Sequence, residues 1–429
     1  MVRSTETLIN TIKKFYTVMQ FLKDRYFPDG RVYYSEKALI ETKKKGRKIA
    51  PYVVPVVGGI AMENEGYRAY EVDAPYIAPK KTITAKDLEK KAFGEKPDSG
   101  RSPAERENEL EAEHLDDLRI SIFRRQEQMC GELLLSGKIT MNHYANANDA
   151  AKGENPSVMM LKFYEHEFKN RYQFTKSFKD MSVSEKIQEL YKMAAVLRKR
   201  GIRATDILMA SDVSMLLMSD KEFLDFYDKA RVDFGDIHQV ETPDGVVCNG
   251  RININGVVMT MFTYDEAYED LDGETKEVIP AGTIAFLHPG MGETVYAQVT
   301  LYSKRDESYH SYAERVVARA VGDENSNVAE VQTFSRPVPY PYDWDGWLVA
   351  NINDEPAASE DIADNSVDTD EPETPGAVLK TEEEIRKMSK KDDLIAYGES
   401  IGLSGLSDEM KLPELRDAVL NYQEETYEQ

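Results

Sequence analysis

The stretch from Ser102 to Gly137 most constrains the fold, because it predicts one long helix without a break. Ser102 is a favoured N-cap residue, Pro103 suits the first helical position, and Glu105 completes an S-x-x-E capping box. Gly137 is a typical C-terminal stop. At about 1.5 Å per residue the helix would be roughly 50 Å long, more than a compact core usually needs. The apolar positions of one face are Leu115, Leu118, Ile122, Met129 and Leu133.

The rest of this helix surface is charged, which predicts a strut lying across a surface; an ordinary long helix of an α+β enzyme is the alternative. The sequence does not favour an enzyme, because it has no P-loop, no G-x-S-x-G motif and no G-x-G-x-x-G motif after a predicted strand. Its histidines are scattered, and Glu165-His166-Glu167 lacks a second histidine at a metal-binding spacing. We therefore expect no catalytic residue, no metal site and no cofactor.

Charge is unevenly distributed along the chain. The 429 residues carry a formal net charge of -23 at pH 7, whereas residues 1–50 are basic, at about +7. A basic arm on an acidic body indicates contact with something acidic, such as the body of another copy, and the overall charge argues against general nucleic-acid binding. Cys130 and Cys248 have no metal-like spacing, which indicates a reduced, cytosolic setting. We expect neither a signal peptide nor a membrane span.

Residues 5–27 predict a helix with a heptad-like apolar seam. Such a seam packs either on its own domain or on a neighbouring subunit, and the sequence leaves both open. The basic run Lys43–Lys48 follows in a predicted loop, which is either solvated or binds a partner. The seam residues are Leu8, Ile12, Phe15, Met19, Leu22 and Tyr26.

Residues 50–83 change to β-forming residues interrupted by prolines. The β-rich runs are 50–59, 67–72 and 75–83, with a turn signal at Glu63-Asn64-Glu65-Gly66. We expect one long β-hairpin whose prolines exclude it from central sheet positions. Because an isolated hairpin is marginally stable in water, this one should lie on another surface.

Residues 182–349 predict a mixed α/β region that begins with a second capping box, Ser182 to Glu185. We expect helices over 182–200 and 212–230, strands over 205–210, 257–262, 283–287 and 294–301, and a proline-rich strand pair over 328–347. Residues 353–376 carry nine carboxylates and no Lys or Arg, which predicts a disordered linker. A helix–extension–helix unit with a charge of about -6 follows it.

The order of these parts resembles the Hong Kong 97-type major capsid fold of tailed phages, and within it the lambda-type capsid protein E family. Tyr52–Gly58 and Pro75–Lys80 match, in loose form, the hairpin pattern Y-V-x-P-x-V followed by P-x-Y-x-x-P-K. Gly137–Met141 matches the G-K-x-T-M that follows the long helix in that family. The likeness is good over 50–141 and weaker over 182–350.

This resemblance implies an α+β fold whose parts can be assigned along the chain. They are an N-terminal arm (1–50), an extended hairpin loop (51–101), a spine helix (102–137), a peripheral domain (138–181 and 325–352) and an axial domain (182–324). The acidic linker (353–376) and the helix–extension–helix module (377–429) lie beyond this core. The module is similar to the SAP and LEM groups, but its acidity argues against nucleic-acid binding.

The resemblance also implies a function: a major capsid protein that assembles with many copies of itself, as hexamers and pentamers, into an icosahedral head shell. The shell would enclose packaged double-stranded DNA without sequence-specific contact and without a membrane. Assembly in the host cytoplasm would involve a separate scaffolding protein, a portal and a decoration protein. An encapsulin-type compartment and a monomeric α/β enzyme remain alternatives. The candidate subunit-interface residues are Tyr52, Val54, Pro55, Val57, Tyr67, Tyr70, Pro75, Tyr76, Pro79, Lys80, Lys44, Arg47, Phe15 and Leu22.

Overall fold

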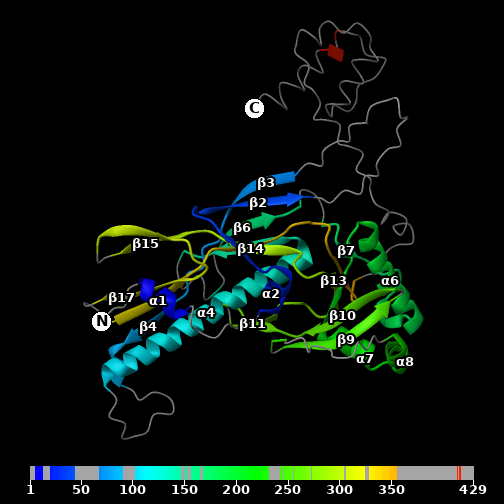
Figure 1. The fold of residues 1–429 in the computed structure, drawn as a ribbon, viewed down its shortest axis with the longest axis horizontal. Coiled ribbons are helices and arrows are strands. Elements are labelled where there is room, and N and C mark those ends of the chain that lie inside the picture. Colours follow the sequence, from blue (N-terminus) through cyan, green and yellow to red (C-terminus); the bar gives the residue numbers. More distant parts are fainter. Residues whose placement is uncertain are drawn as a thin grey trace, which may run out of the picture. The chain divides into compact units, whose positions relative to one another are not determined.

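The computed structural model describes residues 5–12, 20–43, 67–89, 102–145, 149, 152, 156–164, 168–230, 242–243, 245–254, 256–271, 273–303, 306–323, 328–354, 413, 415 and 416. Most of the expected linker and of the 377–429 module lie outside these residues. The same holds for the interface candidates Phe15, Lys44, Arg47, Tyr52, Val54, Pro55 and Val57. The chain divides into two compact units, Met1–Ile362 and Ala363–Gln429, and every labelled element of Figure 1 belongs to the first.

The predicted long helix is confirmed as α4 (Pro103–Ser136), which runs diagonally in Figure 1. Both halves of its capping box form: the Ser102 hydroxyl accepts from the Glu105 N–H at 3.3 Å, and Glu105 Oε2 accepts from the Ser102 N–H at 2.8 Å. At the other end Gly137 adopts a φ of 66°, and its N–H donates to the Leu133 carbonyl. Because residues with a Cβ rarely adopt this φ, glycine ends the helix here.

The apolar stripe of α4 joins two separate cores. Leu115, Leu118 and Ile122 pack in a smaller core with α1 (Thr5–Ile12) and with β4 (Lys80–Thr84), β18 (Val328–Phe334) and the Val316–Ala318 segment. Met129 and Leu133 belong to the main core instead. All five predicted stripe residues are buried, which confirms the face predicted from spacing. The helix is thus the element that both cores share.

The main core is built around a six-stranded mixed sheet with the order β7-β20-β13-β8-β10-β9. The central strands β8 and β13 are buried at every residue, and β8 runs parallel to β10 but antiparallel to β13. The strands are β7 (Arg171–Tyr172), β8 (Asp206–Ala210), β9 (Val246–Ile254), β10 (Val257–Tyr264), β13 (Thr283–Leu287) and β20 (Leu348–Asn351).

Three helices accompany this sheet: α6 (Val183–Lys199), α7 (Ser211–Met218) and α8 (Lys221–Ala230). The Ser182–Glu185 capping box of α6 forms as predicted. The single helix expected over 212–230 is wrong, because the chain breaks at Ser219 and Asp220. There the Asp220 carboxylate accepts the Glu222 N–H at 3.0 Å and starts a new helix.

The remaining strands form smaller sheets. β14 (Gly292–Tyr296) lies between β1 (Asp29–Val32) and β19 (Pro337–Pro341), and β18 lies between β17 (Val317–Asp323) and β4. The two-stranded sheets are β2 (Lys37–Lys43) with β3 (Tyr67–Asp73), β5 (Lys138–His143) with β6 (Ser157–Lys162), β11 (Ala267–Glu269) with β12 (Thr275–Glu277), and β15 (Val299–Ser303) with β16 (Ser308–Tyr312). Short helical turns are α3 (Ala85–Glu89) and η1 (Phe178–Asp180).

Strand membership corrects several expectations. The strand expected over 294–301 is two strands, β14 and β15, in different sheets, and the pair expected over 328–347 is β18 and β19, which do not pair with each other. β20, from the expected peripheral range 325–352, joins the six-stranded sheet, whereas β14 to β17, from the expected axial range 182–324, lie outside it. Pairing between distant strands decides these memberships, and no local pattern records it.

The N-terminal segment also differs from the single helix expected over 5–27. It forms α1 and α2 (Phe21–Tyr26), and Gln20 before α2 is extended. Leu22, an expected interface residue, is fully buried in the main core of its own subunit.

The strand expected over 50–59 and the turn signal at 63–66 lie outside the described residues, whereas the expected run 67–72 forms β3. β3 pairs with β2, from Lys37 opposite Asp73 to Lys43 opposite Tyr67, so the ribbon starts within the range assigned to the arm. β4 does not continue the hairpin; it pairs with β18 beside α4.

Candidate assembly surfaces

Helix α2 fixes the N-terminal segment to the six-stranded sheet. Arg25 binds Asp206 of β8 through two contacts, Nε to Oδ2 at 2.5 Å and Nη2 to Oδ1 at 3.1 Å, and the Tyr26 hydroxyl donates to the same carboxylate at 3.1 Å. The Arg25 guanidinium also stacks over the Phe262 ring, 4.7 Å from its centroid. Because Asp206 is almost fully buried, its charge requires these partners. The strands that follow α2 in the chain, β1 and β2, therefore begin next to a helix that is fixed to the six-stranded sheet.

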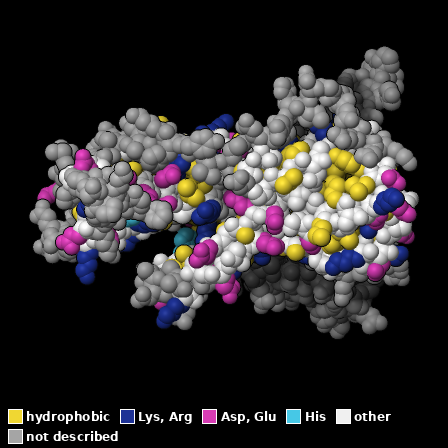
Figure 2. All heavy atoms as spheres, turned by 90° about the horizontal axis from the view of Figure 1, so that it is seen from below, with side chains coloured by type: hydrophobic (Ala, Val, Ile, Leu, Met, Phe, Trp, Pro, Cys, Tyr) yellow, Lys and Arg dark blue, Asp and Glu magenta, His cyan; other side chains and the backbone are white. Residues whose placement is uncertain are grey.

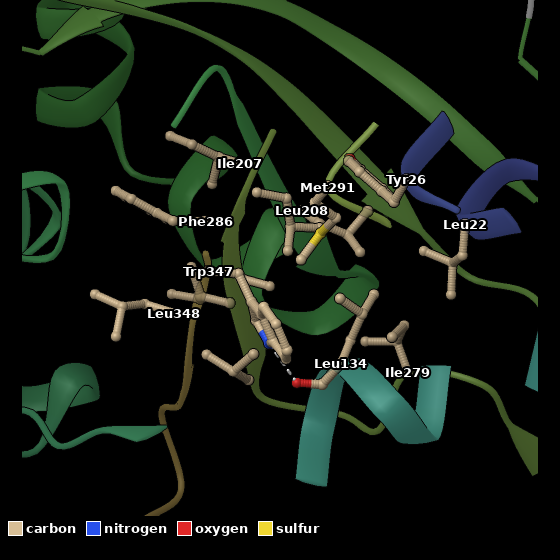
Figure 3. Close-up of a cluster of buried hydrophobic side chains, with 14 of the residues drawn as sticks. Leu22, Tyr26, Leu134, Ile207, Leu208, Ile279, Phe286, Met291, Trp347 and Leu348 are labelled. Atoms are coloured by element: carbon tan, nitrogen blue, oxygen red, sulfur yellow. Dashed lines mark hydrogen bonds between the residues drawn. The ribbon is translucent and has the colours of Figure 1, made fainter. Parts of the chain in front are cut away.

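Trp347 secures the C-terminal end of α4 in the same core. Figure 3 shows its ring among side chains of α2, β8 and β13, with Nε1–H donating to the Leu134 carbonyl at 2.9 Å. This carbonyl belongs to the last turn of α4, where backbone acceptors have no partner within the helix. Trp347 is fully buried, so the indole both fills the core and caps the helix.

The β2–β3 ribbon is anchored on one face only. Ala38, Ile40 and Val72 point into the main core, whereas Leu39 between them is 42% exposed. The hydrogen-bonded strands run on toward residues 44–66, which lie outside the described part of the chain. The backbones of the candidates Tyr67 and Tyr70 belong to this ribbon, within β3. The ribbon is thus a hydrogen-bonded pair of strands, one face of which packs on its own subunit and the other of which is left uncovered.

The stretch Pro75 to Lys80 is built onto its own subunit. Pro75, an expected interface residue, is buried within its own subunit. Pro79 is half-buried, and its carbonyl accepts the Thr333 N–H. Lys80 Nζ binds Glu330 of β18 at 2.9 Å, and this hydrogen bond lowers the pKa of Glu330. These contacts hold the segment against β18.

Tyr76 is the member of that stretch that faces outward. Its ring is 41% exposed, lies 5.8 Å from the Phe334 ring, and carries the Arg336 guanidinium 5.1 Å from its centroid. Partial burial raises the pKa of the Tyr76 hydroxyl. A stacked aromatic and arginine pair offers a large contact area at little cost in side-chain entropy, as is typical of interface anchors.

An apolar patch on α7, α8 and β9 was missed by the sequence reasoning. Met215 is 75% exposed, Val247 57% and Leu224 39%. Figure 2 views the molecule from below relative to Figure 1, and hydrophobic side chains gather on the half that carries α7, α8 and β9. The run Ser211–Met218 is apolar around most of its circumference, which is the signal that could have revealed a second, outward-facing apolar surface.

The described residues give no separate sign of a reaction site. They include no group of three or more His, Cys, Asp or Glu side chains placed to hold a metal. Both cysteines are free thiols, and burial raises the pKa of Cys130 well above its ordinary value. Within the described residues, no helix combines the length and apolar character needed to cross a membrane.

The chain is similar to several solved structures. Among solved structures, a capsid protein assigned to a prophage of Escherichia coli CFT073 aligns with a TM-score of 0.56 and 17% identity, covering 82% of this chain and 99% of that one. A phage-related protein of Bordetella bronchiseptica RB50 aligns with a TM-score of 0.45 and 10% identity, over 83% and 99% of the two chains. An encapsulin of Synechococcus elongatus PCC 7942 aligns with a TM-score of 0.39 and 10% identity, covering 83% of this chain and 99% of that one. No curated protein matches the chain.

The first of these alignments confirms the expected α+β fold of the Hong Kong 97 type, whereas the other two scores are too low to support an argument. The family model described as phage major capsid protein E matches residues 4–351, which is most of the chain and all of its described sheets. The chain therefore belongs to the phage major capsid protein E family.

Proposed function

We propose that this phage capsid shell protein, which assembles with copies of itself in the virion, makes its principal intersubunit contact through the β2–β3 ribbon and the loop that it carries. The observation that supports this is the one-sided anchoring of the ribbon. A two-stranded ribbon is marginal in water, and this one has Leu39 on its uncovered face. A neighbouring copy would cover that face, and the exposed Tyr76 ring would add a further contact.

The apolar patch on α7, α8 and β9 would form a second contact. A chain with a net charge of -23 repels its copies, so copies can meet only where a surface is neutral or of opposite charge. Met215, Leu224 and Val247 provide an uncharged surface at the outer end of the six-stranded sheet. In this proposal these residues meet their equivalents around the centre of each hexamer or pentamer, as the axial assignment of 182–324 implies.

The shell would be icosahedral and would enclose double-stranded DNA, with a separate scaffolding protein, a portal and a decoration protein as partners in the host cytoplasm. Purified particles made with the neighbouring genes test this reading by their content. Nuclease-resistant DNA supports a phage head. A protein cargo without DNA would instead indicate an encapsulin-type compartment, and correctly sized shells from this chain alone would contradict the need for a scaffold.

The contact proposal is tested by replacing residues 44–66 with Asn-Gly. Lys43 and Tyr67 are paired, so a two-residue turn can join β2 to β3 and keep Val72 in the core. We expect a cooperative thermal transition similar to that of the wild type, but no shells in negative-stain micrographs. Shells of normal size from this variant would refute the loop contact.

The patch proposal is tested by Met215→Asp, with Gln188→Asp as its matched control. Gln188 is an exposed polar residue of α6, a helix that contributes no residue to the apolar patch. Both variants should fold, because both side chains face solvent. We expect Met215→Asp to abolish shells and Gln188→Asp to leave them intact; equal yields of shells would contradict the patch as a contact.

A further inference from the structure

Three segments that are distant in the sequence meet at one buried carboxylate, Glu127 of α4. Its Oε1 accepts the Leu22 N–H at 2.7 Å, and its Oε2 accepts the Lys23 N–H at 3.1 Å. Both donors belong to the first turn of α2, where backbone N–H groups have no partner within the helix. The Tyr264 hydroxyl, at the end of β10, lies 3.0 Å from Glu127 Oε1. Glu127 thus joins α4, the N-terminal segment and the six-stranded sheet.

A second carboxylate reaches the same hydroxyl. Glu266 Oε2 lies 3.1 Å from the Tyr264 oxygen, on the loop that follows β10. A phenol has one proton, so it can donate to only one of two carboxylates. The other contact is a hydrogen bond only if that carboxyl group brings its own proton and donates to the phenol oxygen. Both distances lie within hydrogen-bond range, so the geometry calls for one extra proton.

We propose that Glu127, Tyr264 and Glu266 form a proton-dependent latch, in which one proton shared by the two carboxyl groups closes the junction between α2, α4 and the six-stranded sheet, and its loss opens it. Glu127 already accepts two backbone N–H groups, so it is the better acceptor for the phenol. Glu266 then carries the proton and donates it to the Tyr264 oxygen. Without that proton, two negative carboxylates face each other across one hydroxyl in a buried site.

The charged groups around this pair of carboxyl groups act in both directions. On α2, Lys23 is engaged by Asp29 at 2.7 Å and by Asp24 at 3.4 Å. On α4, Cys130 is buried and carries no charge that could offset a carboxylate, while Arg124 acts on Glu266 and opposes its protonation.

The pKa values of both carboxyl groups change in the direction that the latch requires. Burial raises the pKa of Glu127 to about 7, and burial also raises the pKa of Glu266. In the unfolded chain both are ordinary glutamates, so the folded subunit binds the proton more tightly. The stability that this proton contributes is therefore fully present below the pKa of an ordinary glutamate and is lost as the pH rises through about 7, the pKa of Glu127.

The test is urea unfolding of the full-length, unassembled chain between pH 6 and 8.5, comparing wild type with Glu266→Gln. The two carboxyl groups titrate as a coupled pair, and a pKa of about 7, the value to which burial raises Glu127, corresponds to a fall of about ten-fold in the folding equilibrium constant over this range. The amide of Glu266→Gln donates to the Tyr264 oxygen at every pH, so we expect this variant to lose less than about two-fold. Glu269→Gln, at an exposed glutamate of β11, should keep the wild-type profile.

Hydrogen exchange supplies a readout that does not depend on the variant. In wild type, the protection of the Leu22 and Lys23 amides, corrected for the pH dependence of chemical exchange, should fall about ten-fold from pH 6 to 8.5. In Glu266→Gln it should stay constant. Constant protection in wild type, or an equal fall in wild type and Glu266→Gln, would overturn the latch.

Discussion

Gln126 of α4 provides a sharp test of how the long helix is packed. It occupies the apolar stripe, four residues after Ile122 and three before Met129, and is 1% exposed. Among the described residues neither its Oε1 nor its Nε2 has a hydrogen-bond partner. An unpaired polar atom in a buried site costs about 1–3 kcal/mol, because it has lost its bonds to water. Gln126→Met keeps the side-chain length and helix propensity and removes both polar atoms.

We expect Gln126→Met to raise the free energy of unfolding by about 1–3 kcal/mol. Gln20 is the matched control, because it is also buried but is paired: its Nε2 donates to the Phe123 carbonyl at 2.5 Å. Gln20→Met removes that hydrogen bond and should lower stability by about 0.5–1.5 kcal/mol. The same substitution thus has opposite signs at Gln126, within α4, and at Gln20, which lies before α2 and contacts Phe123 of α4.

Urea unfolding of the unassembled subunit measures both changes. The chain has two tryptophans, and Trp347 is fully buried, so its fluorescence reports on loss of the main core. A decrease in stability for Gln126→Met would show that its amide is hydrogen-bonded in the folded subunit, and would refute the reasoning. Equal effects of the two substitutions would do the same.

Two further substitutions test the ends and the close contacts of α4. Trp347→Phe leaves the Leu134 carbonyl without its donor and should cost at least about 1–3 kcal/mol, measured by circular dichroism; an unchanged midpoint would rule out the indole as a cap. Gly131→Ala should destabilise by about 1–3 kcal/mol although alanine favours helix, because its Cβ would lie 2.7 Å from Val278 Cγ1. Ser121→Ala, on the exposed side of the same helix, should change stability by less than about 0.5 kcal/mol, and a similar loss there would show that the Val278 contact is not the cause.

Features set by residues close together in the sequence could be predicted. The caps of α4 and α6 need only Ser102 with Glu105 and Ser182 with Glu185, each three residues apart. The buried strand β8 and the stripe of α4 follow from hydrophobic spacing alone. These features depend only on residues that are close together in the sequence and not on how distant segments pack.

Features set by distant partners could not be predicted. An amphipathic seam does not reveal what covers it, so Leu22 was equally consistent with a neighbouring subunit and with its own core, where it lies. β2 contains Glu41 and two lysines and resembles a charged connector until β3 pairs with it. The outward patch around Met215 depends on where α7 lies on the sheet, which no spacing within the helix records.

The prolines of β19 made this segment look irregular in the sequence, but their alternate spacing has a structural reason. Pro337, Pro339 and Pro341 alternate along this strand, and β14 covers only one of its edges. Val295 and Glu293 of β14 lie opposite the residues between the prolines, which do have N–H groups to donate. The proline nitrogens therefore fall on the outer edge, where no further strand can pair with them. Another strand therefore cannot add to this edge. In a chain that assembles with its own copies, this prevents two copies from pairing through β19.

The long helix α4 has fully paired polar groups at its two ends and less well paired polar groups between them. Its ends are fixed by the capping box at Ser102 and by the Trp347 indole, both fully paired. Its second half instead holds two adjacent buried polar residues: Gln126, which has no hydrogen-bond partner in the described part of the chain, and Glu127, in the cluster for which we propose an extra proton. An apolar residue at Gln126 would give a more stable subunit, so stability alone does not account for that glutamine. At Glu127 an apolar residue would instead leave the Leu22 and Lys23 N–H groups unpaired. Buried polar groups that conflict with local packing are expected where a protein must change state. In this subunit that place is the junction of α2, α4 and the six-stranded sheet, from which the β2–β3 ribbon extends.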